Sequence, residues 1–363
     1  MRSSVILSLL GAALAAAQTP TRKVDFPADS PLSLKSVDWG DSNSTPRGGV
    51  LFLDVHGSLS LVNNSQRHVR SVTLAVVSQE VTPGGKGSVT VPSMDVAPGG
   101  VFPVSIDLRL LRPVGGRNSG ADVEVRLDGV LFDDLSFYGQ DNLHSRRSMT
   151  VWELEARRDR IYLKKLLEQS GRDALQKEMQ ECVARQTDRP QPGVQMVRGR
   201  ATNADPEREL SFAFLEVPDA PIKPTTGMAR IAGNEANGPR LDVLNRSERP
   251  IRYLEMGWVV KDGSGREFLA ASMPADVNLP PGRSGQVIPD FGLRLPARTS
   301  IQSMTGFVST VEFADGSYWI PSRTALNDAK LRHIAAPSPE ETRLTQIYLK
   351  KGLIGLVDEL KKF

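Results

Sequence analysis

The stretch Asn63–Val77 reads NNSQRHVRSVTLAVV, and it decides the fold because Asn245–Val259 repeats its pattern as NRSERPIRYLEMGWV. Each copy begins with an Asn-x-Ser turn and continues into a run in which apolar and polar residues alternate. This alternation is typical of a β-strand with one buried face. The positions shared by the two copies are Asn63 and Asn245, Ser65 and Ser247, Arg67 and Arg249, and Arg70 and Arg252.

Further segments recur in the same order on either side of this stretch. They pair Val96–Gly99 with Leu279–Gly282, Leu108–Leu110 with Leu293–Leu295, Val130–Tyr138 with Val311–Trp319, and Ile161–Lys165 with Ile347–Lys351. Preserved order with small changes in spacing is what loop insertions in a duplicated unit produce. The sequence therefore predicts a tandem duplication.

Each copy contains roughly seven short apolar runs separated by Gly- and Pro-rich turns, which indicates a β-sandwich. Asp262–Gly263 and Asp315–Gly316 are hairpin turns, because Asp-Gly tolerates the positive φ that such turns need. Leu32–Val37 and Leu210–Val217 are the expected opening strands. We predict a mainly β protein with helices, built as two tandem Ig-like antiparallel β-sandwiches at 18–143 and 208–323, each followed by an amphipathic α-helix.

The helices are expected at 144–187 and at 338–363, with a linker at 188–207 between the copies. Ser170–Gly171 is a position at which the first helix could divide into two. The second helix has a start signal at Ser338, where an N-cap serine is followed by Pro339 and by Glu341 three residues later.

The first 17 residues have the features of a signal peptide. Arg2 is followed by the apolar segment Val5–Leu14 and by Ala15–Ala17, a small-residue cleavage site. We expect an exported protein, periplasmic or extracellular; an uncleaved N-terminal membrane anchor is the alternative. No later segment has 18 consecutive apolar residues, so no transmembrane segment is expected in the mature chain.

Charge and cysteine usage exclude several function classes. The 45 basic and 42 acidic residues give a net charge of +3, without the strong basic excess of a nucleic-acid-binding protein. Cys182 is the single cysteine, so no internal disulfide can form. We expect Cys182 to be a buried small apolar side chain of the helix; an intermolecular disulfide is the alternative.

No motif for catalysis, metal or cofactor binding stands out. The four histidines, His56, His68, His144 and His333, lack the spacing of a zinc site, and no nucleophile elbow or phosphate loop is complete. A calcium loop starting at Asp41 would place Phe52 where a bidentate acid is needed. Asp133–Asp134 and Asp315 are explained by turn geometry. We predict no cofactor, no metal and no catalytic residue.

Six residues are candidates for partner binding. The aromatic pairs Phe137–Tyr138 and Tyr318–Trp319 recur at the same place in both copies. Since adjacent strand residues face opposite sides, we expect one of each pair in the core and the other outside. Ile347 and Tyr348 belong to the repeated Ile-Tyr-Leu-Lys-Lys segment, which either packs within the protein or presents a partner- or membrane-binding face.

The second copy resembles the FxLYD-type sandwiches of bacterial exported proteins. The resemblance rests on Asn245–Arg252, the turn Lys261–Gly265 and the turn Leu279–Gly282, about 40 residues in all. The first copy departs from it, since Val77–Ser88 has no such hairpin. The resemblance implies a fold and no catalytic activity.

Duplication without duplicated catalytic residues favours a non-enzymatic function. Our first hypothesis is an exported binding or adaptor protein of the bacterial cell envelope, whose partner is an envelope protein or glycan. The second is a self-associating structural or assembly protein of the cell surface, a homo-oligomer formed through the helices. The third is a hydrolase with a site between the two copies.

Overall fold

The computed structural model describes residues 21–114, 122–189, 193–198, 206–327, 331 and 334–363. The expected signal peptide at 1–17 lies outside the described residues. Strands make up 47% and helices 22% of the described residues, which confirms the prediction of a mainly β fold with helices. The chain forms two compact units, residues 1–149 and 150–363.

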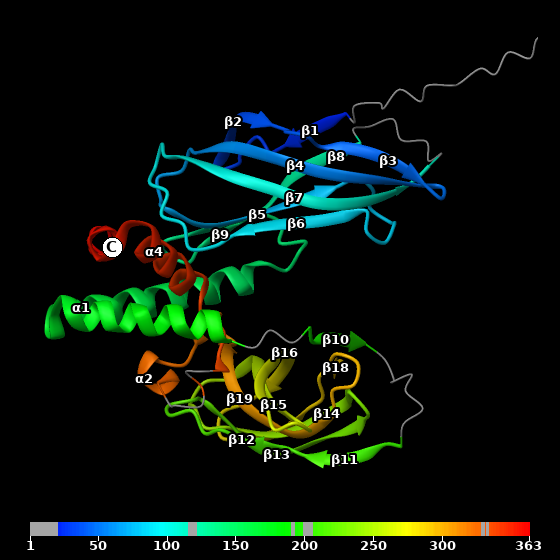
Figure 1. The fold of residues 1–363 in the computed structure, drawn as a ribbon, viewed down its shortest axis with the longest axis vertical. Helices are drawn as coiled ribbons and strands as arrows, with labels where there is room; N and C mark the ends of the chain where they lie inside the picture. Colours follow the sequence, from blue (N-terminus) through cyan, green and yellow to red (C-terminus); the bar gives the residue numbers. More distant parts are fainter. Residues whose placement is uncertain (1–20, 115–121, 190–192, 199–205, 328–330, 332–333) are drawn as a thin grey trace, which may run out of the picture. The chain divides into compact units, whose positions relative to one another are not determined.

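Unit 1 is a β-sandwich of two sheets (Figure 1). Sheet A has the strand order β1-β8-β5-β6, with β9 on β8, and sheet B has the order β2-β4-β3, with β7 on β4. The strands are β1 Arg22–Asp25, β2 Leu32–Asp38, β3 Asn43–Arg47, β4 Val50–Asn63, β5 Val69–Val77, β6 Lys86–Val91, β7 Val101–Pro113, β8 Val123–Phe132 and β9 Phe137–Tyr138.

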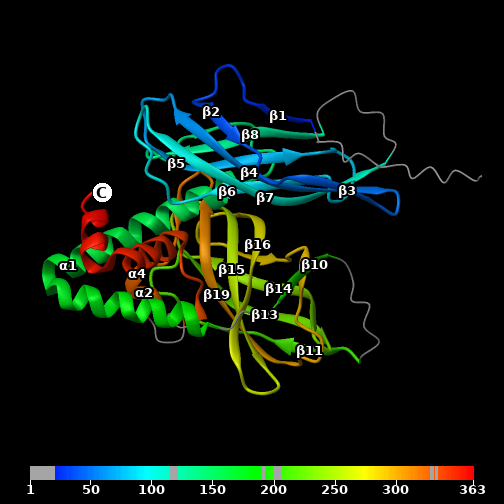
Figure 2. The same ribbon diagram turned by 45° about the horizontal axis from the view of Figure 1, so that its top comes forward.

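Unit 2 contains the second sandwich and most of the helical structure. Sheet C has the order β10-β18-β14-β13-β11, with β17 on β14, and sheet D has β12-β19-β15-β16, with β20 on β19 (Figure 2). The strands are β10 Gln195–Arg198, β11 Arg208–Ser211, β12 Ala213–Phe214, β13 Ile222–Ala232, β14 Glu235–Asn245, β15 Ile251–Asp262, β16 Glu267–Leu279, β17 Ser284–Val287, β18 Phe291–Arg294, β19 Ile301–Phe313 and β20 Tyr318–Trp319.

The two sandwiches share one topology, because sheet D repeats the strand order of sheet A. The sandwiches are not purely antiparallel: β1 pairs with β8 in parallel, and β12 pairs with β19 in parallel. Sheet C departs from sheet B where β17 and β18 replace the single long strand β7, with Pro289 in the interruption. It also gains β10, which lies within the segment expected as a linker.

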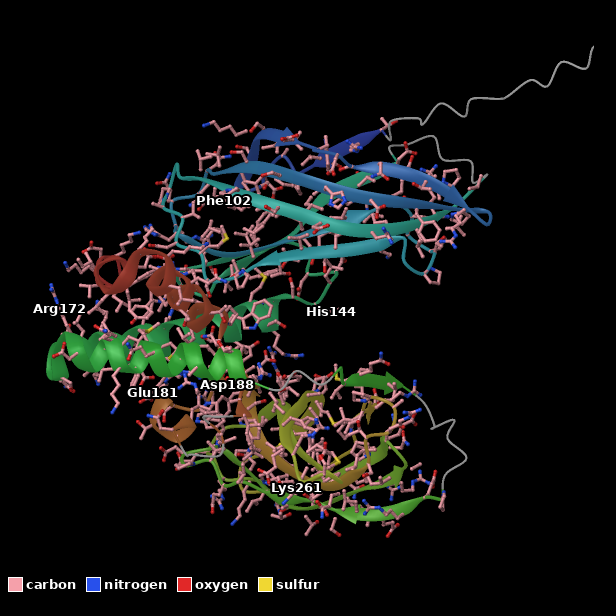
Figure 3. The ribbon with its side chains drawn as sticks, viewed as in Figure 1. Phe102, His144, Arg172, Glu181, Asp188 and Lys261 are labelled. Atoms are coloured by element: carbon pink, nitrogen blue, oxygen red, sulfur yellow. The ribbon has the colours of Figure 1, made fainter. Side chains whose placement is uncertain are left out.

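Alternation along the strands builds each core. In β5, Leu74 and Val76 are fully buried between the sheets of unit 1. Phe102 of β7, labelled in Figure 3, joins the same core. In unit 2 Trp258 is fully buried, and its ring lies 4.5 Å from that of Phe212. The two units thus have separate apolar cores, as independently packed domains do.

The recurring asparagines fold the same turn in both sandwiches. Asn63 Nδ2 donates to the carbonyls of Arg67 (2.8 Å) and Val96 (2.9 Å). Asn245 Nδ2 donates in the same way to Arg249 (2.8 Å) and Leu279 (3.0 Å). Both asparagines are fully buried. This pattern explains the Asn-x-Ser repeat by backbone hydrogen bonding.

The recurring arginine and aspartate of each copy hold the last hairpin. The Arg67 guanidinium lies 3.9 Å from the centre of the Phe132 ring and 3.3 Å from Asp134. Arg249 likewise lies 3.9 Å from the Phe313 ring and 2.5 Å from Asp315. Cation–π contact and an ion pair at equivalent positions therefore explain these repeated residues structurally.

The helices are α1 Arg146–Asp188, α2 Arg323–Leu326 and α4 Pro339–Leu360. Gly171 interrupts α1 with φ 80°, so Figure 1 shows two helical segments running back along each other. Gly352 interrupts α4 in the same manner with φ 67°, which the sequence analysis did not anticipate. Ser338 caps α4 by accepting a hydrogen bond from the Glu341 amide, as predicted.

Helices α1 and α4 pack against each other within unit 2. Their shared apolar cluster contains Leu163, Leu175, Met179, Leu344, Leu356, Val357 and Leu360. The repeated Ile-Tyr-Leu-Lys-Lys segments present different faces to it. Leu163 is buried in α1, whereas the equivalent Leu349 in α4 is 63% exposed. Among the described residues, no helix is both long and apolar enough to cross a bilayer.

Candidate functional site

The four candidate aromatic residues are all half-buried, and one residue of each pair packs on a sandwich core. Tyr138 packs on the unit 1 core and donates from its hydroxyl to Asp29 (3.0 Å). Trp319 packs on the unit 2 core. Phe137 and Tyr318, the other members of the two pairs, are not among the residues of these two cores.

The remaining partner-binding candidates have structural contacts too. Phe137 lies so close to Gly129 that a Cβ there would stand 2.4 Å from its ring. Tyr318 donates from its hydroxyl to Glu312 (2.7 Å). Ile347 and Tyr348 pack against the apolar cluster of the helices. None of the six lines the groove described below.

That groove lies in unit 1, on the face of sheet A that points away from the sandwich core, and we call it the sheet A groove. Its volume is about 640 Å³. All four main strands of sheet A contribute to it, together with the segment after β1 and the loop after β9. Its lining residues are Asp25, Phe26, Pro27, Ala75, Val77, Glu80, Lys86, Arg126, Leu127, Asp128, Gln140, Asn142 and Leu143.

Strand register places the floor of the groove. On β5, Leu74 and Val76 face the core, so Ala75 and Val77 face the opposite side. Ala75 stands opposite Arg126 of β8, and Val77 stands opposite Lys86 of β6. A small and an apolar residue therefore form the floor, with two cationic side chains beside them.

Both cations of the groove are paired with Glu80. Glu80 accepts hydrogen bonds from Lys86 (2.8 Å) and Arg126 (2.6 Å). These two donors lower the pKa of Glu80, which therefore stays ionised at neutral pH. Arg126 also donates to Glu124 at 2.5 Å. This ion-paired group forms one end of the groove.

Asp128 fixes the opposite wall. Its side chain is buried, and its two oxygens accept the backbone N–H groups of Asn142 (3.0 Å) and Leu143 (3.2 Å). The Asn142 amide in turn donates to Gln140 Oε1 (2.8 Å). Hydrogen bonds thus hold the loop after β9, which forms this wall of the groove. The exposed Gln140 side chain of the loop lies at the rim.

The equivalent face of the second sandwich is covered. Strand register makes Gly257 and Phe307 the counterparts of Ala75 and Arg126. In the same way, Leu269 takes the place of Lys86 opposite Val259. These apolar side chains pack with Val217, Ala325 and Leu331 in one apolar cluster. The same sheet face is therefore apolar and covered in unit 2, and polar with an open groove in unit 1.

A second polar cluster lies buried in unit 2, between α1, α2 and α4. Arg323 contacts Glu341 (2.6 Å), Glu178 (3.1 Å) and Asp159 (3.5 Å). Arg185 also contacts Glu341, at 2.9 Å. Within the described part of the chain, no group of three or more His, Cys, Asp or Glu side chains is placed to hold a metal ion. The ion pairs of this cluster connect three helices.

Cys182 lies beside the same cluster and is buried, as the sequence analysis expected. Burial raises the pKa of its thiol to about 12, and the negative charge of Glu341 acts in the same direction. A thiol with such a pKa is protonated at neutral pH and is a poor nucleophile.

The comparisons with known proteins leave the function open. No protein-family model matches the chain, and no curated protein matches it. Among solved structures, "pT26-6p" aligns with 91% of this chain and 72% of its own length, at 7% identity and a TM-score of 0.15. So low a score supports no conclusion about fold or function.

The sheet A groove could not be predicted from the residues that the two copies have in common. The groove lies where they differ, at Lys86 against Leu269 and at Arg126 against Phe307. A comparison of outward-facing positions on paired strands shows these exchanges of charged for apolar residues. These exchanges are visible in the sequence only when the pairing of residues between neighbouring strands is already known.

Proposed function

We propose that this chain is an exported, non-enzymatic binding protein of the bacterial cell envelope, and that it holds its partner in the sheet A groove. The observation that carries the proposal is the open, polar groove of unit 1 on a face that is apolar and covered in unit 2. A concave site with mixed apolar and polar lining is the usual form of a binding site.

The composition of the groove favours binding over catalysis. Its two cationic side chains are both held in ion pairs, because Glu80 is bound to both Lys86 and Arg126. A general acid or base needs a pKa near the working pH, whereas the pKa of Glu80 is lowered. The described lining contains no His, Cys, Ser or Tyr side chain.

Export rests on the N-terminal sequence, whose apolar segment Val5–Leu14 precedes the small residues Ala15–Ala17. We expect mass spectrometry of the native protein to give a chain that begins at Gln18, recovered from the extracytoplasmic fraction. A full-length chain found in the cytoplasm would contradict this part of the proposal.

Site-directed photo-crosslinking in cells tests the groove itself. A photoreactive amino acid replaces Gln140 at the rim, and a control carries it at Arg266 on an exposed turn of unit 2. We expect a discrete crosslinked product from position 140 and none from position 266. The product should vanish when Ala75→Arg fills the floor. Equal products from both positions, or none from position 140, would refute binding in the groove.

Self-association through the helices is the second candidate function. Leu349 and Ile354 on α4 are 63% and 73% exposed, so these two apolar side chains are accessible to a second copy of the chain. Sedimentation of the mature protein at increasing concentration tests it. A dimer that L349K and I354K abolish would support association, and a monomer at high concentration would exclude it.

A further inference from the structure

We infer that the sheet A groove takes an extended peptide segment of about four residues, in which a basic side chain stands next to an apolar one. This inference rests on the proposed binding function and names its ligand class.

The size of the groove fits a short extended chain. Its lining includes Asp25 of β1, Arg126 of β8, Ala75 of β5 and Lys86 of β6, so it crosses all four strands. Four strands spaced about 4.8 Å apart span roughly 14 Å. An extended peptide rises about 3.3 Å per residue, so about four residues fill this length.

The chemistry of the walls fits a peptide better than a sugar. Phe26, Pro27 and Leu143 offer an apolar surface to one side chain of the ligand. The amides of Gln140 and Asn142 are suited to bind backbone N–H and C=O groups. Sugar rings stack on flat aromatic faces, and Phe26 is the single aromatic residue in the described lining.

The charge of the groove selects a cation. The lining carries the carboxylates of Asp25, Glu80 and Asp128 against the two cations Lys86 and Arg126. Both cations already bind Glu80. Asp25 pairs with Lys23, at 3.2 Å, but its side chain remains 53% exposed. The remaining negative charge therefore favours a lysine or arginine of the ligand at the β1 end, next to the apolar wall.

Selection from a peptide library tests the inference directly. Phage that display random heptapeptides are selected on the full mature chain, after depletion on the Ala75→Arg variant. We expect enriched peptides in which Lys or Arg stands beside Leu, Ile, Val or Phe. The most enriched peptide is then made synthetically with a fluorescent label, and its binding is measured by anisotropy.

Three variants make the measurement specific. Ala75→Arg should weaken binding at least tenfold by filling the floor. Asp25→Asn should weaken it about three- to tenfold, and this difference should shrink at high salt. Ser105→Arg, which adds the same side chain on the exposed side of β7, should leave binding unchanged. If Ala75→Arg does not fold, as judged by circular dichroism, Gln140→Arg at the rim replaces it.

The outcomes separate this inference from the function on which it rests. Failure to enrich peptides over the Ala75→Arg protein, or enrichment of acidic peptides, would overturn the peptide inference. If crosslinking from position 140 still yields a groove-dependent product, such as a glycan, the binding function stands without its peptide ligand. If both experiments fail, both proposals fall.

Discussion

Arg323 Nη1 donates to Glu341 Oε2 over 2.6 Å, with 11% and 7% of the two side chains exposed. Burial alone would raise the pKa of Glu341, but Arg323 and Arg185 outweigh it and lower that pKa. The Arg323 guanidinium also reaches Asp159 and Glu178 of α1. One side chain of α2 thereby joins α1 and α4.

Replacing Arg323 by methionine should destabilise unit 2 strongly. The variant keeps an unbranched apolar stem but leaves Asp159, Glu178 and Glu341 without their shared cation. Removing one partner of a buried ion pair costs about 3–5 kcal/mol. Urea unfolding followed by circular dichroism at 222 nm, where the helices dominate, measures the change.

Arg246→Ala is the matched control. Arg246 also contacts a carboxylate, Glu216, at 3.1 Å, but the two side chains are 40% and 68% exposed. Exposed ion pairs contribute about 0–1 kcal/mol. If Arg323→Met and Arg246→Ala lowered the free energy of unfolding equally, burial of the Arg323 cluster would have no energetic consequence.

The duplicated turn could be predicted from the sequence, whereas the Arg323 cluster could not. The Asn-x-Ser turns at Asn63 and Asn245 were predictable because turn chemistry is local and occurs twice. The Arg323 cluster was not predictable, because it joins segments more than a hundred residues apart. Strand and helix periodicity carries no information about which distant charges meet.

The candidate site also depends on tertiary contacts that the sequence pattern does not predict. Recurring aromatics such as Phe137 and Trp319 attract attention as shared features, and the structure gives them packing contacts. The groove instead depends on how tertiary packing covers one sheet face and leaves its equivalent open. Sequence patterns predict which face of a strand is buried, but they do not tell which of two equivalent outer faces another segment will cover.

Asn63→Ala should destabilise unit 1 by about 2–4 kcal/mol. The substitution removes the two hydrogen bonds that Asn63 Nδ2 donates to the Arg67 and Val96 carbonyls, and the two that its Oδ1 accepts from Ser65. Asn64→Ala, one residue later at an exposed position, should change stability by less than about 0.5 kcal/mol. Differential scanning calorimetry of both variants provides the test; similar melting temperatures would exclude a structural role for the Asn63 side chain.

Gly257→Ala should destabilise unit 2 by about 1–3 kcal/mol. A Cβ at Gly257 would stand 2.3 Å from the ring of Phe307, which is itself buried in the cluster that covers sheet D. The equivalent position in unit 1 is already alanine, Ala75, because Arg126 replaces the phenylalanine there. Exchanging Phe307 for alanine in the Gly257→Ala background should remove the clash. Double-mutant analysis by urea unfolding checks this coupling; additive losses would contradict it.

Cys182 should resist alkylation in the folded protein. Its thiol is buried, and its pKa is raised to about 12, mainly by burial. At pH 8 we expect no modification by iodoacetamide within hours and complete modification in urea. Mass spectrometry distinguishes the two states. Rapid labelling of the native protein, or a disulfide-linked dimer under non-reducing conditions, would show that the thiol is accessible.

Glu155 should make unit 2 less stable as the pH rises from about 4.5 to 7. Burial raises the pKa of Glu155 from 4.5 to about 7, and Arg158 opposes this rise. Nearby Asp159, Glu255 and Glu341 raise it further. Between these two pH values the folded state holds a proton that the unfolded state has released, so unfolding becomes easier as the pH increases. Above about pH 7 the Glu155 carboxyl is ionised in both states, and the stability of unit 2 falls no further from this group.

Since 26% of the Glu155 side chain is exposed, we expect a total loss of about 1–3 kcal/mol rather than that of a fully buried acid. Glu155→Gln keeps the shape and the neutral charge of the protonated side chain, so its stability should stay level over this range. Urea unfolding of both proteins at intervals from pH 4.5 to 8 measures the difference. Parallel curves would show that Glu155 titrates normally, whereas curves that diverge toward high pH confirm a carboxyl that folding keeps protonated.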